Sequence, residues 1–362
     1  MAEVEGRKKH GWFSRLTFGT AALAVSVLLF LSYVSVLVNP AKAWFFTLFG
    51  LLFVPLLLLT LLFFVWAIIR RSRMTGFLLV MLLPAFFLFG KYYQFKRPEP
   101  EREPTLKVVS YNVGLFAHGN EGDRRLVLAD SVASFLRRTD ADIICLQEFY
   151  PKFIAYHKEW FDSTGYQSLQ FNTVAVLSRL PFLGDTIHIN YPTRSNHSLA
   201  CWIDLGGDSL LIINNHLESN HLSPEERDEY TNAITDPNRE SIKSSSRKLM
   251  SKLSEAAAYR GAQTDSICAI LERYAGHPTI VCGDLNDTPI SYTYQRLSRR
   301  LTSAYREAGF GPGFTFSRRS FPVHIDHLFF SNHWTCTSCN IDRTVLSSDH
   351  YPLIVRLSKK EQ

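Results

Sequence analysis

The sequence predicts an α/β domain that follows three membrane-spanning helices. From Leu16 to about Gly90 the chain consists mainly of Leu, Phe, Val and Ala, whereas from about Thr105 onward it mixes charges, aromatics and short apolar runs. The second part alternates strand-like runs with two segments of helical spacing, 124–138 and 247–273. Its length of roughly 255 residues suits one sizeable core.

Residues 1–95 are expected to form a membrane anchor with three segments, at 16–38, 44–69 and 74–93. The first is an unbroken apolar run of the length that a bilayer requires. Basic residues precede it, as in a signal peptide, but two more apolar segments and the lack of a small-residue cleavage site favour a permanent anchor. Because Pro84 interrupts the third segment, a re-entrant loop is the alternative there.

The basic residues predict the orientation of the anchor. Three arginines follow the second segment and a basic cluster precedes the first, whereas only Lys42 lies between the two. By the positive-inside rule, three spans place the following domain on the non-cytoplasmic side, which in a bacterium is the periplasmic face of the inner membrane. Residues 96–104 are charged and rich in proline, so a semi-rigid linker is expected before the domain of residues 105–358.

The positive charge of the chain belongs to its membrane part. Residues 1–104 hold 12 Lys and Arg against 5 Asp and Glu, whereas the rest holds 27 and 28. The second domain therefore lacks the overall basic charge that is typical of nucleic-acid enzymes, although a local patch stays open. Of the six cysteines, Cys145 and Cys282 are expected in the core. Cys336 and Cys339 are expected to form a disulfide or to remain two free thiols.

Six strand-like runs in the second domain each adjoin polar side chains that bind metals or transfer protons. These side chains are Asn112, Glu148, His216, Asp284 with Asn286, Asp326, and Asp349 with His350. One such strand end carries little information. Six of them indicate that the strand ends converge on one polar site.

The motifs at these strand ends resemble those of the endonuclease/exonuclease/phosphatase (DNase I-like) superfamily, as in a membrane-anchored bacterial-type member. They are SYN (110–112), LQE (146–148), NNHL (214–217), GDLN (283–286), IDH (325–327) and SDHYP (348–352), in the order of the family. The resemblance covers Leu106 to Leu357 and not the membrane part. It implies a four-layered α/β sandwich, in which two packed β-sheets are covered by helices on both outer faces.

The residues suggest a metal site and an acid–base set. Glu148 is a hard oxygen ligand suited to Mg²⁺ or Mn²⁺, with Asn112 and Asp349 as further candidates. Asp284 and Asn286 lie two residues apart, so an extended backbone would point both to one side. By analogy with the family, Asp284 orients or deprotonates the attacking water and Asn286 holds the water or the phosphate. His216 and His350 would donate to phosphate oxygens or transfer protons, and Asp326 would orient a histidine.

The resulting hypothesis is a Mg²⁺- or Mn²⁺-dependent phosphoesterase tethered to the bilayer, that is, a nuclease, a phospholipid or sphingolipid phosphodiesterase, or a phosphatase. Its substrate, nucleic acid or lipid head group, is left undecided. A catalytically silent membrane-anchored binding protein on the same fold is the alternative. Two departures from the family bear on substrate: His324 and His327 replace the usual Arg and Tyr, and the polar stretch 218–248 is expected to form a flexible loop.

Overall fold

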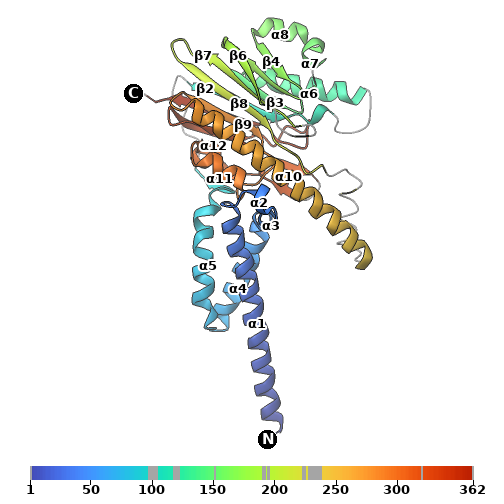
Figure 1. Cartoon of the computed structure of the whole chain (residues 1–362), viewed down its shortest axis with the longest axis vertical. Helices are drawn as coiled ribbons and strands as arrows, with labels where there is room; N and C mark the ends of the chain where they lie inside the picture. Colours follow the sequence, from blue (N-terminus) through green and yellow to red (C-terminus); the bar gives the residue numbers. More distant parts are fainter. Residues whose placement is uncertain are drawn as a thin grey trace.

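The computed structural model describes residues 2–96, 105–116, 123–150, 152–189, 193, 196–221, 226, 239–318 and 321–360. A bundle of helices from the start of the chain stands at one end of a larger body built from two β-sheets (Figure 1). We call this bundle, residues 2–92, the N-terminal helical unit. Of the linker expected at residues 96–104, residues 97–104 lie outside the described part of the chain.

The first sheet has six strands in the described part of the chain: β2 (Thr105–Asn112), β3 (Ile143–Gln147), β4 (Gln167–Phe171), β5 (Val174–Ser178), β15 (Trp334–Ile341) and β16 (Leu353–Lys359). Their order is β15-β16-β2-β3-β5-β4. Strands β2 and β3 are parallel and the other neighbours are antiparallel.

The second sheet is built in the same way from β6 (Phe182–Ile189), β7 (Ser198–Asp204), β8 (Ser209–His216), β9 (Thr279–Asp284), β10 (Thr302–Ser303) and β14 (Asp326–Phe330). Their order is β10-β14-β9-β8-β7-β6, with a parallel pair, β8 and β9, in the middle. In each sheet the two parallel strands therefore end next to each other, and the polar residues that follow them are brought together.

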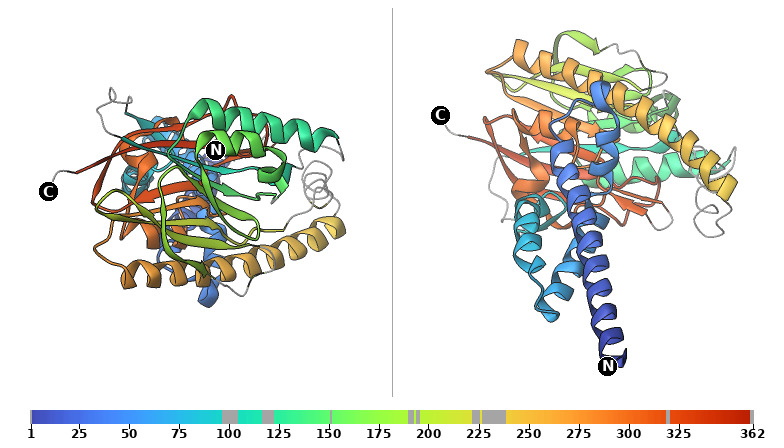
Figure 2. Two further views of the ribbon diagram at one scale, coloured as in Figure 1. Left: turned by 90° about the horizontal axis from the view of Figure 1, so that it is seen from above. Right: turned by 60° about the horizontal axis from the view of Figure 1, so that its bottom comes forward.

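Helices cover both outer faces of the sandwich. The core between the sheets is formed by alternate residues such as Val108, Cys145, Ile212 and Cys282. Outside the first sheet lie α6 (Asp123–Thr139), α7 (Lys152–Tyr156) and α8 (Lys158–Thr164), and outside the second lie α10 (Arg239–Arg273) and α11 (Tyr292–Ser298). Figure 2 shows these layers from above. The two mixed sheets and their helices confirm the α/β architecture expected from the motifs.

Smaller elements complete the domain, namely η1 (Gly114–Phe116), α12 (Ala304–Ala308), the pair β1 (Tyr93–Phe95) and β11 (Phe310–Pro312), and the pair β12 (Phe316–Arg318) and β13 (Phe321–Val323). All six cysteines are free and buried, so Cys336 and Cys339 on β15 form no disulfide. Helix α10 begins at Arg239, eight residues before the expected start at 247. Residues 239–248, the last part of the loop expected at 218–248, are therefore helical. Each serine disfavours a helix interior by only about 0.5 kcal/mol, and packing of the rest of α10 offsets this cost.

The N-terminal helical unit contains α1 (Ala2–Ser35), α2 (Pro40–Ala43), α3 (Phe45–Leu51), α4 (Phe53–Ile69) and α5 (Met74–Phe89). Within the described residues, one helical stretch, Thr17–Ser35, is long and apolar enough to cross a membrane. Helices α3 and α4 would count as a second span only if their 60° bend is accepted within it. By length and composition alone, the described residues therefore show one or two of the three membrane helices that we expected. The third segment, expected to reach residue 93, is helical only to Phe89, because Lys91 and the residues after it pack against the sandwich.

Candidate active site

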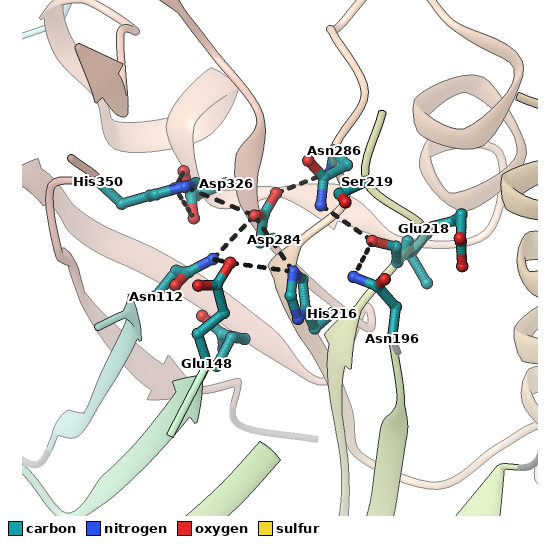
Figure 3. Close-up of polar contacts among 12 residues, drawn as sticks. Asn112, Glu148, Asn196, His216, Glu218, Ser219, Asp284, Asn286, Asp326 and His350 are labelled. Carbon is teal, nitrogen blue, oxygen red and sulfur yellow. Dashed lines mark hydrogen bonds and ion pairs between the residues drawn. The ribbon is translucent and has the colours of Figure 1, made fainter. Parts of the chain in front are cut away.

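The polar strand ends meet where the two sheets face each other (Figure 3). The first sheet supplies Asn112 from the end of β2 and Glu148 from directly after β3. The second supplies His216 and Asp284 from the ends of β8 and β9, and Asp326 from the start of β14. His350 precedes β16 and completes the group. The convergence that the sequence predicted is therefore present, with residues from both sheets.

The backbone turns sharply at two of these positions. Glu148 has a φ of 48° and Asn286 a φ of 50°, both in the left-handed region, which is uncommon for residues other than glycine. The turn at Glu148 is secured by hydrogen bonds from Leu115 N to its carbonyl and from Phe149 N to the carbonyl of Thr173, each 2.8 Å long. The turn directs the Glu148 side chain into the site, where it is one-third exposed. Strained conformations of this kind are frequent at functional sites.

Asn112 links carboxylates from the two sheets. Its Nδ2 donates to Asp284 Oδ2 at 3.0 Å and to Glu148 Oε1 at 3.3 Å, while its Oδ1 accepts from Gly114 N at 3.0 Å. One amide group therefore holds two acidic side chains near each other. Since two carboxylates repel, an arrangement of this kind needs protons or a cation between them.

His350 is held in place by Asp326. Its Nδ1 lies 2.9 and 3.1 Å from the two carboxylate oxygens of Asp326, and its Nε2 lies 3.7 Å from Asp284 Oδ2. Asp326 is itself fixed, because the hydroxyl of Thr315 accepts hydrogen bonds from the backbone N–H groups of residues 325 and 326. The ring of Phe316 packs edge-on against His350. This geometry answers which Asp pairs with which His, a question that the sequence left open.

His216 is buried without a hydrogen bond to either ring nitrogen among the described residues. Its Nε2 lies 3.5 Å from Glu148 Oε1 and 3.9 Å from Asp284 Oδ2, which is too long for a hydrogen bond. A buried polar atom without a partner is uncommon in native proteins and calls for an explanation. A bound ligand between His216 and the carboxylates would supply the missing partner.

Burial and neighbouring charges shift the acid–base equilibria of the site. Burial raises the pKa of Asp284 to about 7, although His350 nearby acts to lower it. Burial alone would lower the pKa of His350, but the charges of Asp326 and Asp284 raise it to about 10. Burial lowers the pKa of His216, against the effect of Glu148. At neutral pH the site thus combines a protonated His350, a neutral His216 and an Asp284 near its midpoint.

Two further predicted residues lie beside this group. The amide of Asn286 donates to the carbonyl of Leu217 at 2.9 Å, and its backbone N–H donates to Asp284 Oδ1 at 2.8 Å. Asp349 lies near the turn at Gly114 and contributes negative charge to the surroundings of His350. It is not part of the cluster of possible metal ligands that the structure brings closest together.

Sequence reasoning missed the residues that hold the two sheets in register at the site. The Nε2 of Gln147 donates to Asn214 Oδ1 at 2.6 Å, and Asn214 Nδ2 donates to the carbonyls of Leu146 and Ala175. Both residues are fully buried inside apolar strands. A polar side chain in a buried strand needs a partner, and this was the signal that could have identified them. Gly283 is also required, since a Cβ there would lie 1.9 Å from the carbonyl oxygen of Asn215.

The donor set fits a divalent cation with oxygen ligands. Ligand atoms of Asp284, Asp326 and His350 lie within 4.8 Å of one another, and Glu148 and Asn112 stand next to Asp284. In the part of the chain that the structure describes, no Lys or Arg forms an ion pair with Glu148, Asp284 or Asp326. Carboxylates gathered this closely repel one another, and a bound cation would relieve that repulsion.

Comparisons with known proteins bear on the family of this chain. A family model described as Endonuclease/Exonuclease/phosphatase family matches residues 109–350. A second model, a domain of unknown function termed DUF8431, matches residues 14–92, which lie within the N-terminal helical unit. Nothing among the curated proteins matches the sequence.

Solved structures share the fold at low sequence identity. The human Nocturnin catalytic domain with bound sulfate is 18% identical, with a TM-score of 0.53 over 72% of this chain and 97% of that one. An endonuclease/exonuclease/phosphatase from Bacteroides vulgatus is 16% identical, with a TM-score of 0.52 over 71% of this chain and all of that one. TDP2 from D. rerio in complex with a single-strand DNA product is 15% identical, with a TM-score of 0.51 over 71% and 100%.

Proposed function

Because the chain belongs to the endonuclease/exonuclease/phosphatase family, we propose that it is a metal-dependent hydrolase of phosphate esters, tethered to a membrane by its N-terminal helical unit. The observation that carries this proposal is the convergence of Asn112, Glu148, His216, Asp284, Asp326 and His350. Members of this family usually hydrolyse phosphodiesters or phosphate monoesters. The alternative, a catalytically silent binding protein, is not favoured, because the chain belongs to a family of hydrolases and keeps the polar side chains that we assign to the chemistry.

We propose Mg²⁺ or Mn²⁺ as the cofactor, which Glu148, Asn112 and Asp349 would hold. The cation would neutralise the phosphate and stabilise the charge that develops on it. The residues around it then have separate tasks.

The protein side chains would carry the proton transfers. Asp284, with a pKa of about 7, accepts a proton from the attacking water as the new O–P bond forms. Asn286 holds that water through its Oδ1, since its amide N–H already bonds to Leu217. His350, kept protonated and oriented by Asp326, donates to a phosphate oxygen, and His216 provides a second imidazole donor. The bond between phosphorus and the leaving oxygen breaks, that oxygen takes a proton from solvent, and Asp284 later releases its own proton to solvent.

The substrate class is tested by direct assay of the full-length protein in detergent. The panel holds plasmid DNA, RNA, sphingomyelin, phosphoinositides and a chromogenic bis-phosphodiester, each with Mg²⁺, Mn²⁺ or EDTA. We expect turnover of one class that EDTA abolishes and either cation restores. DNA belongs on the panel because the D. rerio TDP2 structure holds a DNA product, although the near-neutral charge of this domain gives it no special support. Activity that resists chelation would contradict the metal mechanism.

We propose further that α1, α3 with α4, and α5 are three membrane segments, and that the sandwich lies on the non-cytoplasmic side. The outer surface of the N-terminal helical unit supports this, because Leu62, Ile69, Phe86 and Phe87 each expose two-thirds or more of their surface. Soluble proteins rarely leave large apolar surfaces in water. The arginines at 70, 71 and 73 lie together between α4 and α5, at the end of the bundle remote from the sandwich (Figure 1).

Reporter fusions in a bacterial host test the proposed topology. Alkaline phosphatase fused after Lys360 is expected to be active and green fluorescent protein at the same site to be dark, because both outcomes require export. A matched pair of fusions after Arg71 should show the reverse pattern. Fluorescence at Lys360 with silent phosphatase would contradict three spans and place the domain in the cytoplasm.

A further inference from the structure

Lys91, two residues after the end of α5, is buried where the N-terminal helical unit meets the sandwich. Only 4% of its surface is exposed. Its Nζ donates to the carbonyl of Pro289 at 3.2 Å, lies 3.5 Å from Gln295 Oε1 and stands 4.7 Å from the centre of the Tyr294 ring. In the described part of the chain it forms no ion pair with a carboxylate. A buried ammonium without such a partner costs stability, so its position calls for a functional reason.

Pro289 belongs to the loop that carries two proposed catalytic residues. Asp284 and Asn286 open this loop, and Ile290 ends it inside an apolar cluster of the N-terminal helical unit with Leu29 and Phe53. The contact is tight, since a Cβ on Gly50 of α3 would lie 2.2 Å from the carbonyl oxygen of Ile290. The loop is therefore held at one end by β9 and at the other by the N-terminal helical unit.

The same lysine also contacts the segment that carries Asp326. Its backbone carbonyl accepts a hydrogen bond from His324 Nδ1 at 3.2 Å. The next carbonyl, of Tyr92, accepts from Gly313 N at 2.8 Å and from the hydroxyl of Tyr305 at 3.1 Å. Strand β1 then pairs with β11, so the connection from α5 is joined to the sandwich along its length.

His324 and His327 close the link between the two catalytic segments. Their rings lie 4.3 Å apart, and His327 Nε2 lies 3.3 Å from the carbonyl oxygen of Asp287 in the loop. Asp326 stands between them in sequence. These two histidines are the departures from the family motif that no step of the proposed chemistry uses. Their contacts indicate a structural role, because His324 contacts the N-terminal helical unit and His327 contacts the loop of Asp284.

We propose that the N-terminal helical unit is a positioning part of the active site, and that Lys91, His324 and His327 hold the Asp284 loop and the Asp326 strand at their working separation. The inference rests on the proposed phosphoesterase function and extends it. On this view the unit does more than attach the enzyme to a bilayer: its seating against the sandwich sets the geometry between Asp284 and His350. Small displacements of catalytic groups lower turnover far more than they lower stability.

The test compares Lys91→Met with Lys42→Met in the full-length protein. Methionine keeps most of the lysine volume and removes the ammonium, and Lys42 is an exposed lysine of the same unit. We expect Lys91→Met to lower kcat about tenfold with KM within about twofold of wild type, as for an interaction that acts on the transition state. Its Tm should stay within about 4 °C of that of Lys42→Met, and Lys42→Met should match wild type in activity.

A second pair keeps the proposal falsifiable if Lys91→Met does not fold. His327→Gln retains a donor near the position of Nε2, whereas His327→Phe keeps the ring and loses the donor. We expect kcat to fall for His327→Phe and to be largely retained for His327→Gln. Equal activity of both His327 variants, or wild-type kcat in a folded Lys91→Met, would overturn the inference. Inactivity of the wild type on every substrate would instead speak against the proposed function, so the two failures are distinguishable.

Discussion

Replacing Asp284 with asparagine is expected to lower kcat by about 10³-fold or more while the fold is kept. General base catalysis alone accounts for roughly 10²–10⁴-fold, and Asp284 is also placed to contact the cation. Asparagine has nearly the same shape and can still accept the hydrogen bond from Asn286 N. The loss of activity should therefore come from chemistry and cation binding, and the measurement is kcat on whichever substrate of the panel is turned over.

The same variant should change how the stability of the metal-free protein depends on pH. Burial raises the pKa of Asp284 from 3.8 to about 7, so the folded state holds a proton that the unfolded chain releases between these values. Stability from this group is complete at low pH and is lost as pH rises through 7. His350, raised from 6.5 to about 10, acts in the same direction at higher pH. In EDTA the Tm of the wild type should therefore fall from pH 5 to pH 9.

Asp284→Asn removes the part of this pH dependence that lies below about pH 7, because asparagine does not ionise. In EDTA its Tm at pH 7.5 should therefore equal or exceed that of the wild type. Asp208→Asn is the matched control, because Asp208 is an exposed partner of Lys359 at the end of β8 opposite to His216. It should retain full activity and the wild-type pH dependence. An Asp284→Asn protein with near-normal kcat, or with an unchanged slope of Tm against pH, would show that this carboxylate is not the buried base assigned here.

Much of the site was predictable because each motif stands at a strand end. Asn112, Glu148, His216 and Asp284 follow apolar runs directly, and parallel neighbours in a sheet bring such ends together. The pairing of His350 with Asp326 was not predictable, since it depends on how β14 and the segment before β16 approach across two different sheets. Sequence distance carries no information about that approach.

The packing of the N-terminal helical unit was less predictable for a different reason. A hydropathy profile does not distinguish Leu, Phe and Val that face lipid from those that face another protein segment. It also predicts that Lys91 lies at the end of a membrane span. The structure instead buries Lys91 against Pro289 and Tyr294. Long-range contacts of this kind leave no periodic pattern in the sequence. The unusual histidines at 324 and 327 were the one visible sign, and they were interpreted only as a difference from the family.

The second large effect is expected for the pair of Asp326 and His350. Asp326→Asn should lower kcat by roughly 10²–10⁴-fold, because an amide can present N–H to His350 Nδ1, which selects the wrong tautomer and removes the charge that keeps the imidazole protonated. His350→Gln should have an effect of the same size. Both side chains are almost fully buried, with a Nδ1–Oδ2 distance of 2.9 Å, so the carboxylate is placed to act on the reaction through this ring.

The double variant shows whether Asp326 acts through His350 or whether the two residues contribute to kcat independently. If Asp326 works only through His350, Asp326→Asn combined with His350→Gln should be about as slow as the slower single variant, since residues that act as a unit are not additive. Independent roles would multiply the two losses. The comparison requires folded proteins, so each Tm is measured alongside kcat, with Asp208→Asn again as the control. A multiplicative loss would mean that Asp326 contacts the cation or substrate itself, as its place in the cluster with Asp284 also permits, and the orienting role would then be abandoned.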